Sequence, residues 1–286
     1  MKILITGAFG QLGEILTLTL SSYNEVIKTG RKVPNGRRGI VLDICNKIIL
    51  KEIIKISNPD IIINLAAITN VDYCEQNPVL ANQVNVMGVE NICDVFSGKI
   101  IHLSSDYVFD GKNGPYREYD TTNPISIYGK TKLNAEKIII NHSPSNLIIR
   151  GNVIYSDSLI SEASFLNWVI KSLSNKNKIK VVNDQYNNPT WTKSLANVIC
   201  LCLKNDVTGL YHWGDKDYIN RYEFALKIAE VYNLENNFIK PIKTSDLNQI
   251  AKRPLKSGLI SNELQNILNV EPPTVKECLI MIKGNN

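Results

Sequence analysis

The chain has 286 residues, of which 44% are hydrophobic and 21% charged, and this composition is typical of a globular protein with a sizeable core. Its net charge of +5 is small and its basic residues are scattered, which argues against a nucleic-acid-binding protein. No apolar run reaches the roughly 18 residues of a membrane-spanning helix. Because MKILITG leads directly into a strand pattern and not into a signal peptide, we expect a cytoplasmic protein with no membrane partner.

Short apolar runs alternate with helical patterns over the first half of the chain. Strands alternating with helices at this spacing predict right-handed crossovers and an α/β fold, a doubly wound parallel sheet of the Rossmann type. A cofactor should then bind at the carboxyl ends of the strands. Predicted strands cover residues 2–6, 25–29, 39–43, 60–67, 99–105 and 146–151, and predicted helices cover residues 11–20, 47–56, 79–96 and 126–140.

The pattern becomes irregular after residue 152, and the strand at 146–151 closes the predicted alternation. We therefore expect a dinucleotide-binding Rossmann domain over residues 1–151. Residues 152–286 should form mainly a smaller C-terminal substrate-binding lobe, with some segments returning to the first domain. Helices in this part are predicted near residues 161–174, 192–204, 220–233, 261–269 and 274–283, separated by turns rich in Asn and Pro.

Metal chemistry has little support in the sequence. The six cysteines form no CxxC pair and have no metal-type spacing with the three histidines, so we expect reduced thiols packed as small apolar groups. The isolated residues His102, His142 and His212 are interpreted as structural or surface residues, and Arg150 as structural. The sequence predicts no metal site.

The segment GAFGQLG places Gly7, Gly10 and Gly13 between a predicted strand and a predicted helix. Glycine allows the backbone to approach a diphosphate, whose charge is stabilised by the amides and the positive dipole at the helix N-terminus. A tight turn without a ligand would use the same residues. The position between a strand and a helix favours dinucleotide binding.

The end of the second predicted strand bears on the choice of cofactor. A site for NAD usually has an acidic residue there, about 20 residues after the glycines, to hold the ribose hydroxyls. This chain has Arg31 instead, which could pair with a 2′-phosphate with the support of Lys32 or Arg37. The pattern favours NADP(H). A solvated basic loop is the alternative, and NAD(H) stays open.

Tyr128 and Lys132 form a YxxxK pair one turn apart on a predicted helix, downstream of the strand that ends in Ser105. A carbonyl that receives a hydride needs a proton at its oxygen, which a phenol can provide. A neighbouring ammonium should lower the pKa of the phenol and bind the nicotinamide ribose, while the serine hydroxyl holds the carbonyl oxygen. We interpret Ser105, Tyr128 and Lys132 as catalytic residues, with Tyr128 and Lys132 also in contact with the ligands.

Seven segments carry a resemblance to a known family: GAFGQLG, PDIIINLAAITNVDYCE, SSDYVFDG, NPISIYGKTKLNAE, LIIR, NDQYNNPT and AKRP. With them the chain resembles the extended short-chain dehydrogenases/reductases, and among these the dTDP-4-dehydrorhamnose reductases, over nearly its whole length. The resemblance implies roles for further residues. Gly10, Gln11 and Leu12 would touch the cofactor, Asp43 and Ile44 would lie near the adenine, Ala66, Ala67 and Thr69 would line the route to the nicotinamide, and Ser105 and Asp106 would face the substrate.

The chain departs from this family at several positions. Ser105 stands where a Thr is usual and keeps the hydroxyl, and Ala135 replaces a common Gly. Val153 lies in RGNVIY, where relatives have RTSWVY with a Trp that contacts the sugar nucleotide, and Asn187 replaces a usual Gly. Val153 cannot stack as the Trp does. These last two changes concern the substrate and leave the hydride chemistry unaffected.

The resemblance implies an NADPH-dependent oxidoreductase that reduces the C4 ketone of a nucleotide-linked 4-keto-6-deoxyhexose, giving dTDP-L-rhamnose. Arg253, before Pro254, would bind a substrate phosphate or form a surface ion pair. The nucleotide sugar is the expected partner, and a homodimer stays open.

Two other functions are compatible with the same scaffold. A sugar-nucleotide epimerase or 4,6-dehydratase is one, but dehydratases typically have Asp and then Glu after the catalytic Thr, and here Tyr107 follows Asp106. The other is a non-catalytic regulatory subunit that resembles the β subunit of methionine adenosyltransferase.

Overall fold

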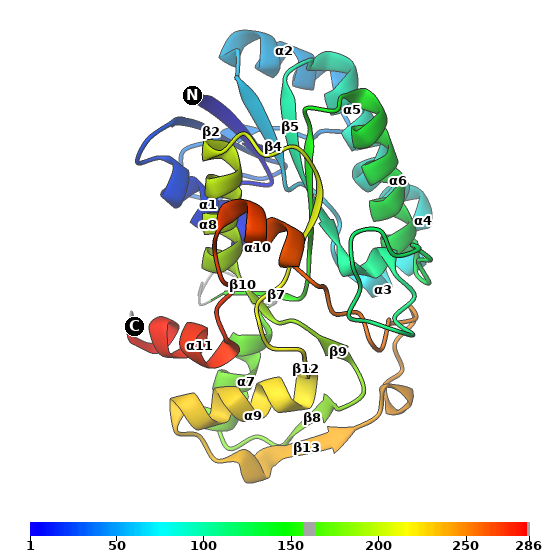
Figure 1. Ribbon diagram of the computed structural model, residues 1–286, viewed down its shortest axis with the longest axis vertical. Coiled ribbons are helices and arrows are strands. Elements are labelled where there is room, and N and C mark those ends of the chain that lie inside the picture. Colours follow the sequence, from blue (N-terminus) through cyan, green and yellow to red (C-terminus); the bar gives the residue numbers. More distant parts are fainter. Residues whose placement is uncertain (157–163, 285–286) are drawn as a thin grey trace.

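A parallel sheet forms the centre of the upper part of the molecule in Figure 1, and its strand order is β11-β6-β5-β4-β1-β2-β3. The computed structural model describes residues 1–156 and 164–284. Every pair of neighbouring strands in this sheet is parallel, which confirms the predicted doubly wound α/β fold. The strands are β1 (Lys2–Thr6), β2 (Glu25–Gly30), β3 (Ile40–Val41), β4 (Ile61–Asn64), β5 (Lys99–Ser105), β6 (Leu147–Gly151) and β11 (Gly209–Trp213).

Helices cover both faces of the sheet because alternate strand residues point to opposite sides. Ile3 and Ile5 of β1 pack with one set of helices, and Leu4 between them packs with the other. The strands are therefore apolar on both faces, as buried parallel strands are. On the first face lie α1 (Gln11–Leu20), α8 (Thr192–Lys204) and α10 (Asn262–Leu268), and on the second lie α2 (Lys47–Ser57), α5 (Gly88–Val95) and α6 (Ile127–His142).

The predicted alternation does not end at residue 151. β11 pairs with β6 at the edge of the sheet, and α8 packs beside α1 in the same core. Segments that return to the first domain were expected, but the strand β11 was not predicted, because the connection from β6 to β11 runs through the second lobe. No compact strand-helix-strand spacing marks it in the sequence.

The segment predicted as one helix over residues 79–96 is divided. α4 (Pro78–Asn82) and α5 are separated by a π-helical turn, η1 (Gln83–Met87). At this turn the Asn85 side chain accepts a hydrogen bond from Ile68 N at 2.7 Å and donates to Thr131 Oγ1 at 3.1 Å. Such widened turns often occur near functional sites. A short helix before it, α3 (Val71–Gln76), was not predicted.

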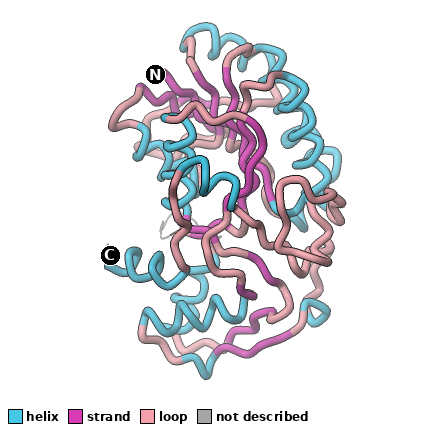
Figure 2. Tube along the Cα trace, viewed as in Figure 1, coloured by secondary structure: helices cyan, strands magenta, loops and turns pink. Residues whose placement is uncertain are grey.

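A second core forms the lower part of the molecule in Figures 1 and 2. Its large side chains include Phe224, Trp191 and Tyr155. Of the helix predicted at 161–174, residues 161–163 lie outside the described residues, and α7 covers Phe165–Ser174. The other elements here are β8 (Ile179–Val182), α9 (Arg221–Tyr232), β13 (Ile239–Ile242), α11 (Val275–Gly284), the short strands β7 (Ile154–Tyr155), β9 (Tyr186–Asn187), β10 (Thr190–Trp191) and β12 (Ile219–Asn220), and the 3-10 turns η3 (Asn236–Phe238) and η4 (Thr244–Asp246).

A buried ion pair connects α6 with the sheet. Arg150 of β6 donates to both carboxylate oxygens of Glu136, at 2.9 and 2.8 Å, and Ser104 of β5 also donates to this carboxylate. Arg150 further lies 3.2 Å from Nε2 of His212 on β11. These contacts agree with the structural role predicted for Arg150, since the charge is buried and fully paired.

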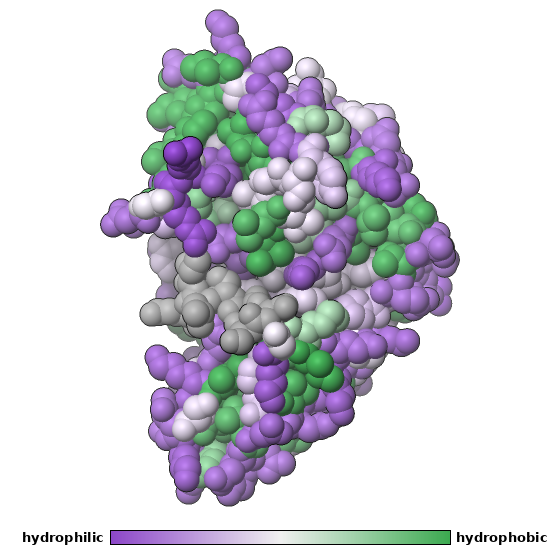
Figure 3. Space-filling model, turned by 90° about the vertical axis from the view of Figure 1, so that its left-hand side faces the viewer, coloured by the Kyte–Doolittle hydropathy of each residue, from purple (hydrophilic) through white to green (hydrophobic). Residues whose placement is uncertain are grey.

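Hydrophilic and apolar side chains are mixed on the face of the molecule that Figure 3 shows. On the face shown in Figure 3, hydrophilic side chains are spread over the upper and lower parts, and apolar ones form separate patches between them. Among the described residues, no helix has both the length and the apolar character that crossing a membrane requires.

Candidate active site

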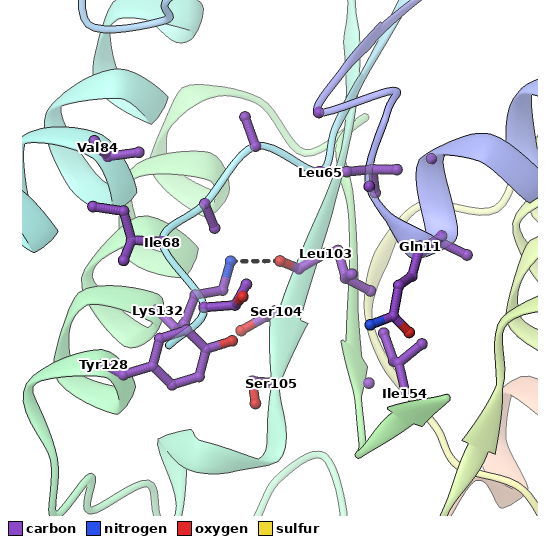
Figure 4. A pocket seen from close by; sticks show the side chains of 18 of the residues that line it. Gln11, Leu65, Ile68, Val84, Leu103, Ser104, Ser105, Tyr128, Lys132 and Ile154 are labelled. Atoms are coloured by element: carbon purple, nitrogen blue, oxygen red, sulfur yellow. Dashed lines mark hydrogen bonds between the residues drawn. The ribbon is translucent and has the colours of Figure 1, made fainter. Parts of the chain in front are cut away.

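A cavity of about 620 Å³ opens at the carboxyl ends of the sheet strands. Its walls come from the glycine turn, the ends of β4, β5 and β6, the first turns of α6, and residues of the second lobe (Figure 4). The volume is that of a typical small-molecule site. Of the residues predicted from the sequence, those that line it are Gly7, Gly10, Gln11, Leu12, Gly13, Arg31, Asp43, Ile44, Ala66, Ala67, Thr69, Ser105, Asp106, Tyr128, Lys132 and Val153.

The glycine turn has the geometry of an anion cradle. Gly7 has φ +68°, in the left-handed region, and a Cβ on Gly13 would lie 2.4 Å from Gly7 O. Both glycines are thus required for the turn itself. Gly10 differs, because a Cβ there would meet only Gly7 O, at 3.4 Å. As the N-cap of α1 without a side-chain cap, Gly10 leaves the first amides of the helix available to a ligand anion.

The basic residues after β2 are not equivalent. Arg37 forms an ion pair with Glu14 at 2.8 Å, and Lys32 is exposed and does not line the cavity. Arg31 lines it, and its charge lowers the pKa of the nearby Cys45 thiol against the larger effect of burial. Of the three cations considered from the sequence, Arg31 is the one placed to reach a phosphate in the cavity.

Tyr128 and Lys132 project from α6 toward the end of β5, where Ser105 lies (Figure 4). Ser126 caps the helix by accepting a hydrogen bond from Gly129 N at 3.2 Å, which puts Tyr128 in the first turn. Gly129 permits a close approach to the chain after β5, because a Cβ there would lie 2.1 Å from Tyr107 O. The YG dipeptide therefore holds Tyr128 beside Ser105.

Burial dominates the acid-base properties of this group. It raises the pKa of Tyr128, and the hydrogen bond with Ser105 opposes the rise only in part. Burial lowers the pKa of Lys132 to about 8, with Glu136 acting in the opposite direction. The lysine donates to Leu103 O at 2.6 Å. We expected Lys132 to lower the pKa of Tyr128. The structure instead gives a raised pKa, because desolvation of the buried phenol is the largest effect.

Asp106 is buried beside Ser105, in the turn η2 (Asp106–Val108). Its two oxygens accept hydrogen bonds from Ser105 Oγ at 2.9 Å and from Ser257 Oγ at 2.6 Å. Burial raises the pKa of this carboxyl to about 6 although both hydrogen bonds lower it. Asp106 therefore orients the Ser105 hydroxyl as well as lining the cavity.

Comparisons with known proteins show to which family the chain belongs. The model of the RmlD substrate binding domain matches residues 1–282. The chain is 31% identical to the dTDP-4-dehydrorhamnose reductase of Aggregatibacter actinomycetemcomitans, over 99% of this chain and 98% of that protein. The chain belongs to the dTDP-4-dehydrorhamnose reductase family. The predicted enzyme class, an NAD(P)H-dependent oxidoreductase of this family, is thereby confirmed.

Two further relatives of this reductase-family chain bear on its cofactor and its function. The crystal structure of the Bacillus anthracis dTDP-4-dehydrorhamnose reductase in complex with NADP superposes with a TM-score of 0.91 at 28% identity, covering 100% of this chain and 99% of that one. Methionine adenosyltransferase 2 subunit beta of Xenopus laevis is 30% identical over 93% of this chain and 82% of that protein. The chain is therefore similar both to a reductase solved with NADP and to a subunit of a methionine adenosyltransferase.

Only some of the residues predicted to contact the substrate lie in the cavity wall of this reductase-family chain. Val153 lines the cavity, whereas Arg253 does not and forms an ion pair with Asp72 at 2.8 Å. Asn187 is buried in the short strand β9, outside the cavity lining. Of the two alternatives for Arg253, the structure shows the ion pair.

Sequence reasoning missed Arg221 and Phe165, two cavity residues from the second lobe. The guanidinium of Arg221 lies over the Phe165 ring, with its carbon 5.2 Å from the ring centroid. Within the described residues its side chain has no hydrogen bond or ion pair. A helix was predicted near residues 220–233, and a capping box of Asn220 and Glu223 does begin α9, but no local pattern shows that this helix end faces the cavity.

The two glycines of the turn should respond differently to a methyl group. We expect Gly13→Ala to destabilise the fold by about 1–3 kcal/mol through overpacking. Gly10→Ala should leave the unfolding free energy within about 0.5 kcal/mol and still raise the Kd of NADPH at least about tenfold, because the methyl group crowds the amides that face the ligand. Thermal melts and fluorescence titration measure the two effects. Unchanged NADPH binding in Gly10→Ala would show that the diphosphate does not bind at this turn.

Proposed function

We propose that the protein uses NADPH to reduce the C4 ketone of a nucleotide-linked 4-keto-6-deoxyhexose, converting dTDP-4-dehydrorhamnose to dTDP-L-rhamnose. The observation that carries the proposal is the convergence of Ser105, Tyr128 and Lys132 on the cavity that begins at the glycine turn. Family membership supports the same chemistry, because relatives along the whole chain bear this reductase name. When bound, the nicotinamide supplies the hydride.

The protein side chains then act on the carbonyl oxygen. Tyr128 donates the proton that this oxygen needs as the carbon accepts the hydride. Ser105 donates its one hydroxyl proton to Asp106 Oδ1 at 2.9 Å in this structure, and it would turn this proton to the carbonyl oxygen to hold the substrate. Burial makes the Tyr128 phenolate costly, so the proton stays on the tyrosine until the developing alkoxide takes it. Lys132 provides the positive charge next to the resulting phenolate.

Dehydration is disfavoured by the residue after Asp106. Tyr107 is an aromatic residue where the dehydratases have a carboxylate, and its ring packs edge-on against Tyr128 with centroids 5.4 Å apart. No second acid or base occupies this position. A reductase fits the site better than a dehydratase does.

The similarity to methionine adenosyltransferase 2 subunit beta keeps a regulatory function as the second candidate. The same nucleotide cavity would then stabilise a contact with another protein. Retention of Ser105, Tyr128 and Lys132 in one cavity favours the enzyme.

Two arginines, Arg31 and Arg221, line different parts of the cavity and could each bind an anionic group of a ligand. Arg31 lies at the end near Asp43 and would hold the 2′-phosphate of NADPH. Arg221 lies on the second lobe, close enough to Asp106 and Tyr107 for its charge to lower the pKa of both groups. Because its guanidinium forms no hydrogen bond or salt bridge with the described residues, we assign to it the diphosphate of the nucleotide sugar.

Reduction itself is tested with purified protein, NADPH and dTDP-4-dehydrorhamnose. We expect NADPH oxidation, and a rate about 10²–10⁴-fold lower in Tyr128→Phe because the proton donor is lost. Tyr23→Phe, at a fully surface-exposed tyrosine, is the matched control and should be unchanged. No NADPH oxidation, together with stoichiometric recovery of a methionine adenosyltransferase from native extract, would favour the regulatory subunit. Stoichiometric NAD retained through purification would favour an epimerase.

Cofactor choice is tested at Arg31. Arg31→Ala should weaken NADPH binding about tenfold or more while changing NADH binding little, since only NADPH carries the 2′-phosphate. Arg38→Ala removes a nearby exposed charge outside the cavity and serves as the control. Titration of both cofactors measures the ratio. Equal losses for NADPH and NADH would contradict the assignment.

The diphosphate contact is tested at Arg221. Arg221→Met keeps the apolar stem of the side chain and removes the charge, so the KM of the nucleotide sugar should rise about tenfold or more with little change in kcat. Lys227→Met, on the same helix but outside the cavity, should leave both values unchanged. An unchanged KM in Arg221→Met would place the diphosphate elsewhere.

A further inference from the structure

A row of buried polar side chains crosses the otherwise apolar sheet and ends at the catalytic lysine. Thr6, Asn64 and His102 are register partners on β1, β4 and β5, and each is only 1% exposed. Thr6 Oγ1 donates to Asn64 Oδ1 at 2.5 Å, and Asn64 Nδ2 lies 3.0 Å from His102 Nδ1. His102 Nε2 then lies 3.2 Å from Lys132 Nζ.

The other end of the row also reaches the cavity. Thr6 Oγ1 accepts a hydrogen bond from the backbone amide of Ala66 at 3.3 Å, and Ala66 lines the cavity. The Thr6–Asn64–His102 row therefore joins the wall near Ala66 to Lys132. Buried polar side chains such as Thr6, Asn64 and His102 favour arrangements in which each donor meets an acceptor.

A charged Lys132 permits one such arrangement. His102 is neutral, because burial and the charge of Lys132 keep the pKa of its ring well below the usual range. An ammonium group can only donate, so His102 Nε2 must accept and the ring proton must sit on Nδ1. The amide oxygen of Asn64 must then face His102.

A neutral Lys132 permits the opposite arrangement. The amine can accept a hydrogen bond from His102 Nε2–H, and His102 Nδ1 then accepts from the Asn64 amide nitrogen. This is the amide orientation in the structure, where Thr6 donates to Asn64 Oδ1. A half-turn of the amide converts one arrangement into the other. The two nitrogen groups of Lys132 and His102 hold four protons in the first and three in the second, and the proton released passes to the cavity.

We propose that His102 is a positioning residue for Lys132, and that the Thr6–Asn64–His102 row changes between two hydrogen-bond arrangements as Lys132 gains and loses a proton. The row fixes the direction of the lysine side chain together with the Leu103 carbonyl, to which Lys132 donates at 2.6 Å. His102, which was interpreted from the sequence as structural, would then take part in the active site. It rests on the role of Lys132 in the proposed function.

The neighbouring charges place this change in an accessible pH range. Burial lowers the pKa of Lys132 to about 8, and Glu136, one turn along α6, raises it. Since the pKa is depressed, the ammonium form predominates below pH 8 and is lost as the pH rises through it. The other ionisable groups around the lysine and Tyr128 are Arg150 of β6, which holds Glu136, Asp106 and Tyr107 of η2, and Cys74 of α3.

Nitrogen-15 NMR of labelled histidine tests the proposal without substrate or cofactor. The chain has three histidines, so His142→Gln and His212→Gln assign the signals. In the unmodified protein we expect the proton of the His102 ring to move from Nδ1 to Nε2 as the pH rises, with a midpoint near pH 8. In Lys132→Met the tautomer should not depend on pH. His142→Gln, at the far end of α6, should leave the His102 transition unchanged.

Two substitutions should move the transition in a defined way. Asn64→Asp presents only acceptors to the ring, which fixes the proton on Nδ1, favours the lysine ammonium and raises the midpoint by about one pH unit or more. His102→Phe removes the acceptor for the ammonium, so the loss of NADPH oxidation at high pH should begin about one pH unit lower. His102→Gln, whose amide oxygen can accept, should restore the original profile.

The outcomes separate this inference from the proposed function. A His102 tautomer that stays constant from pH 6 to 10, or that changes in the same way in Lys132→Met, overturns the positioning role whether or not the protein reduces a keto-sugar. A tautomer change near pH 8 without NADPH oxidation supports the row and rejects the proposed function. Equal pH profiles for His102→Phe and His102→Gln would show a purely structural histidine.

Discussion

The close contact between the first turns of α6 and the end of β5 is the constraint on which the site depends. Gly129 lies so near the Tyr107 carbonyl that any side chain would collide with it, and Lys132 donates to Leu103 O from the same helix. Farther along, Ser104 and Arg150 both bind the Glu136 carboxylate. α6 therefore has one position relative to the strand that carries Ser105. Because Tyr128 is rigidly held, its phenol and the serine hydroxyl can meet a carbonyl without further ordering.

Burial of charged and polar groups sets the chemistry of the cavity. The sheet is apolar on both faces, so each polar group within it needs a partner. Glu136 is satisfied by an arginine and a serine, Asp106 by two serines, and His102 by an amide. Desolvation raises the pKa of Tyr128 and lowers that of Lys132, so it shifts both groups toward the uncharged state. In the proposed reaction, proton transfer from Tyr128 to the substrate would therefore depend on charge that develops at the carbonyl oxygen.

The chain after β6 supplies cavity residues outside the Ser105, Tyr128 and Lys132 group. Val153 and Arg221 both face the cavity, and neither takes part in the proton transfer. An aliphatic side chain where relatives have Trp removes a stacking surface, whereas Arg221 stacked on Phe165 adds a cation. The affinity for the nucleotide sugar would then rely more on charge than on stacking.

Local patterns were sufficient for the elements that repeat at short range. Alternating residues such as Ile3, Leu4 and Ile5 predict a strand buried on both faces, and GAFGQLG predicts the turn before α1 because glycine has no Cβ to collide with Gly7 O. The YxxxK spacing alone put Tyr128 and Lys132 on one face of a helix. What the sequence determined was therefore the Rossmann scaffold, the glycine turn before α1 and the placement of Tyr128 and Lys132 on one helix face.

Only the tertiary structure decided which distant groups meet. β11 pairs with β6 only after the chain has passed through the second lobe, so no local spacing in the sequence predicted this strand. Arg253 and Arg221 look alike in the sequence, yet one pairs with Asp72 and the other faces the cavity. His102 seemed isolated because its partners Asn64 and Lys132 are 38 and 30 residues away along the chain. Such roles depend on strand register and helix docking, which are properties of the assembled sheet and not of any single segment.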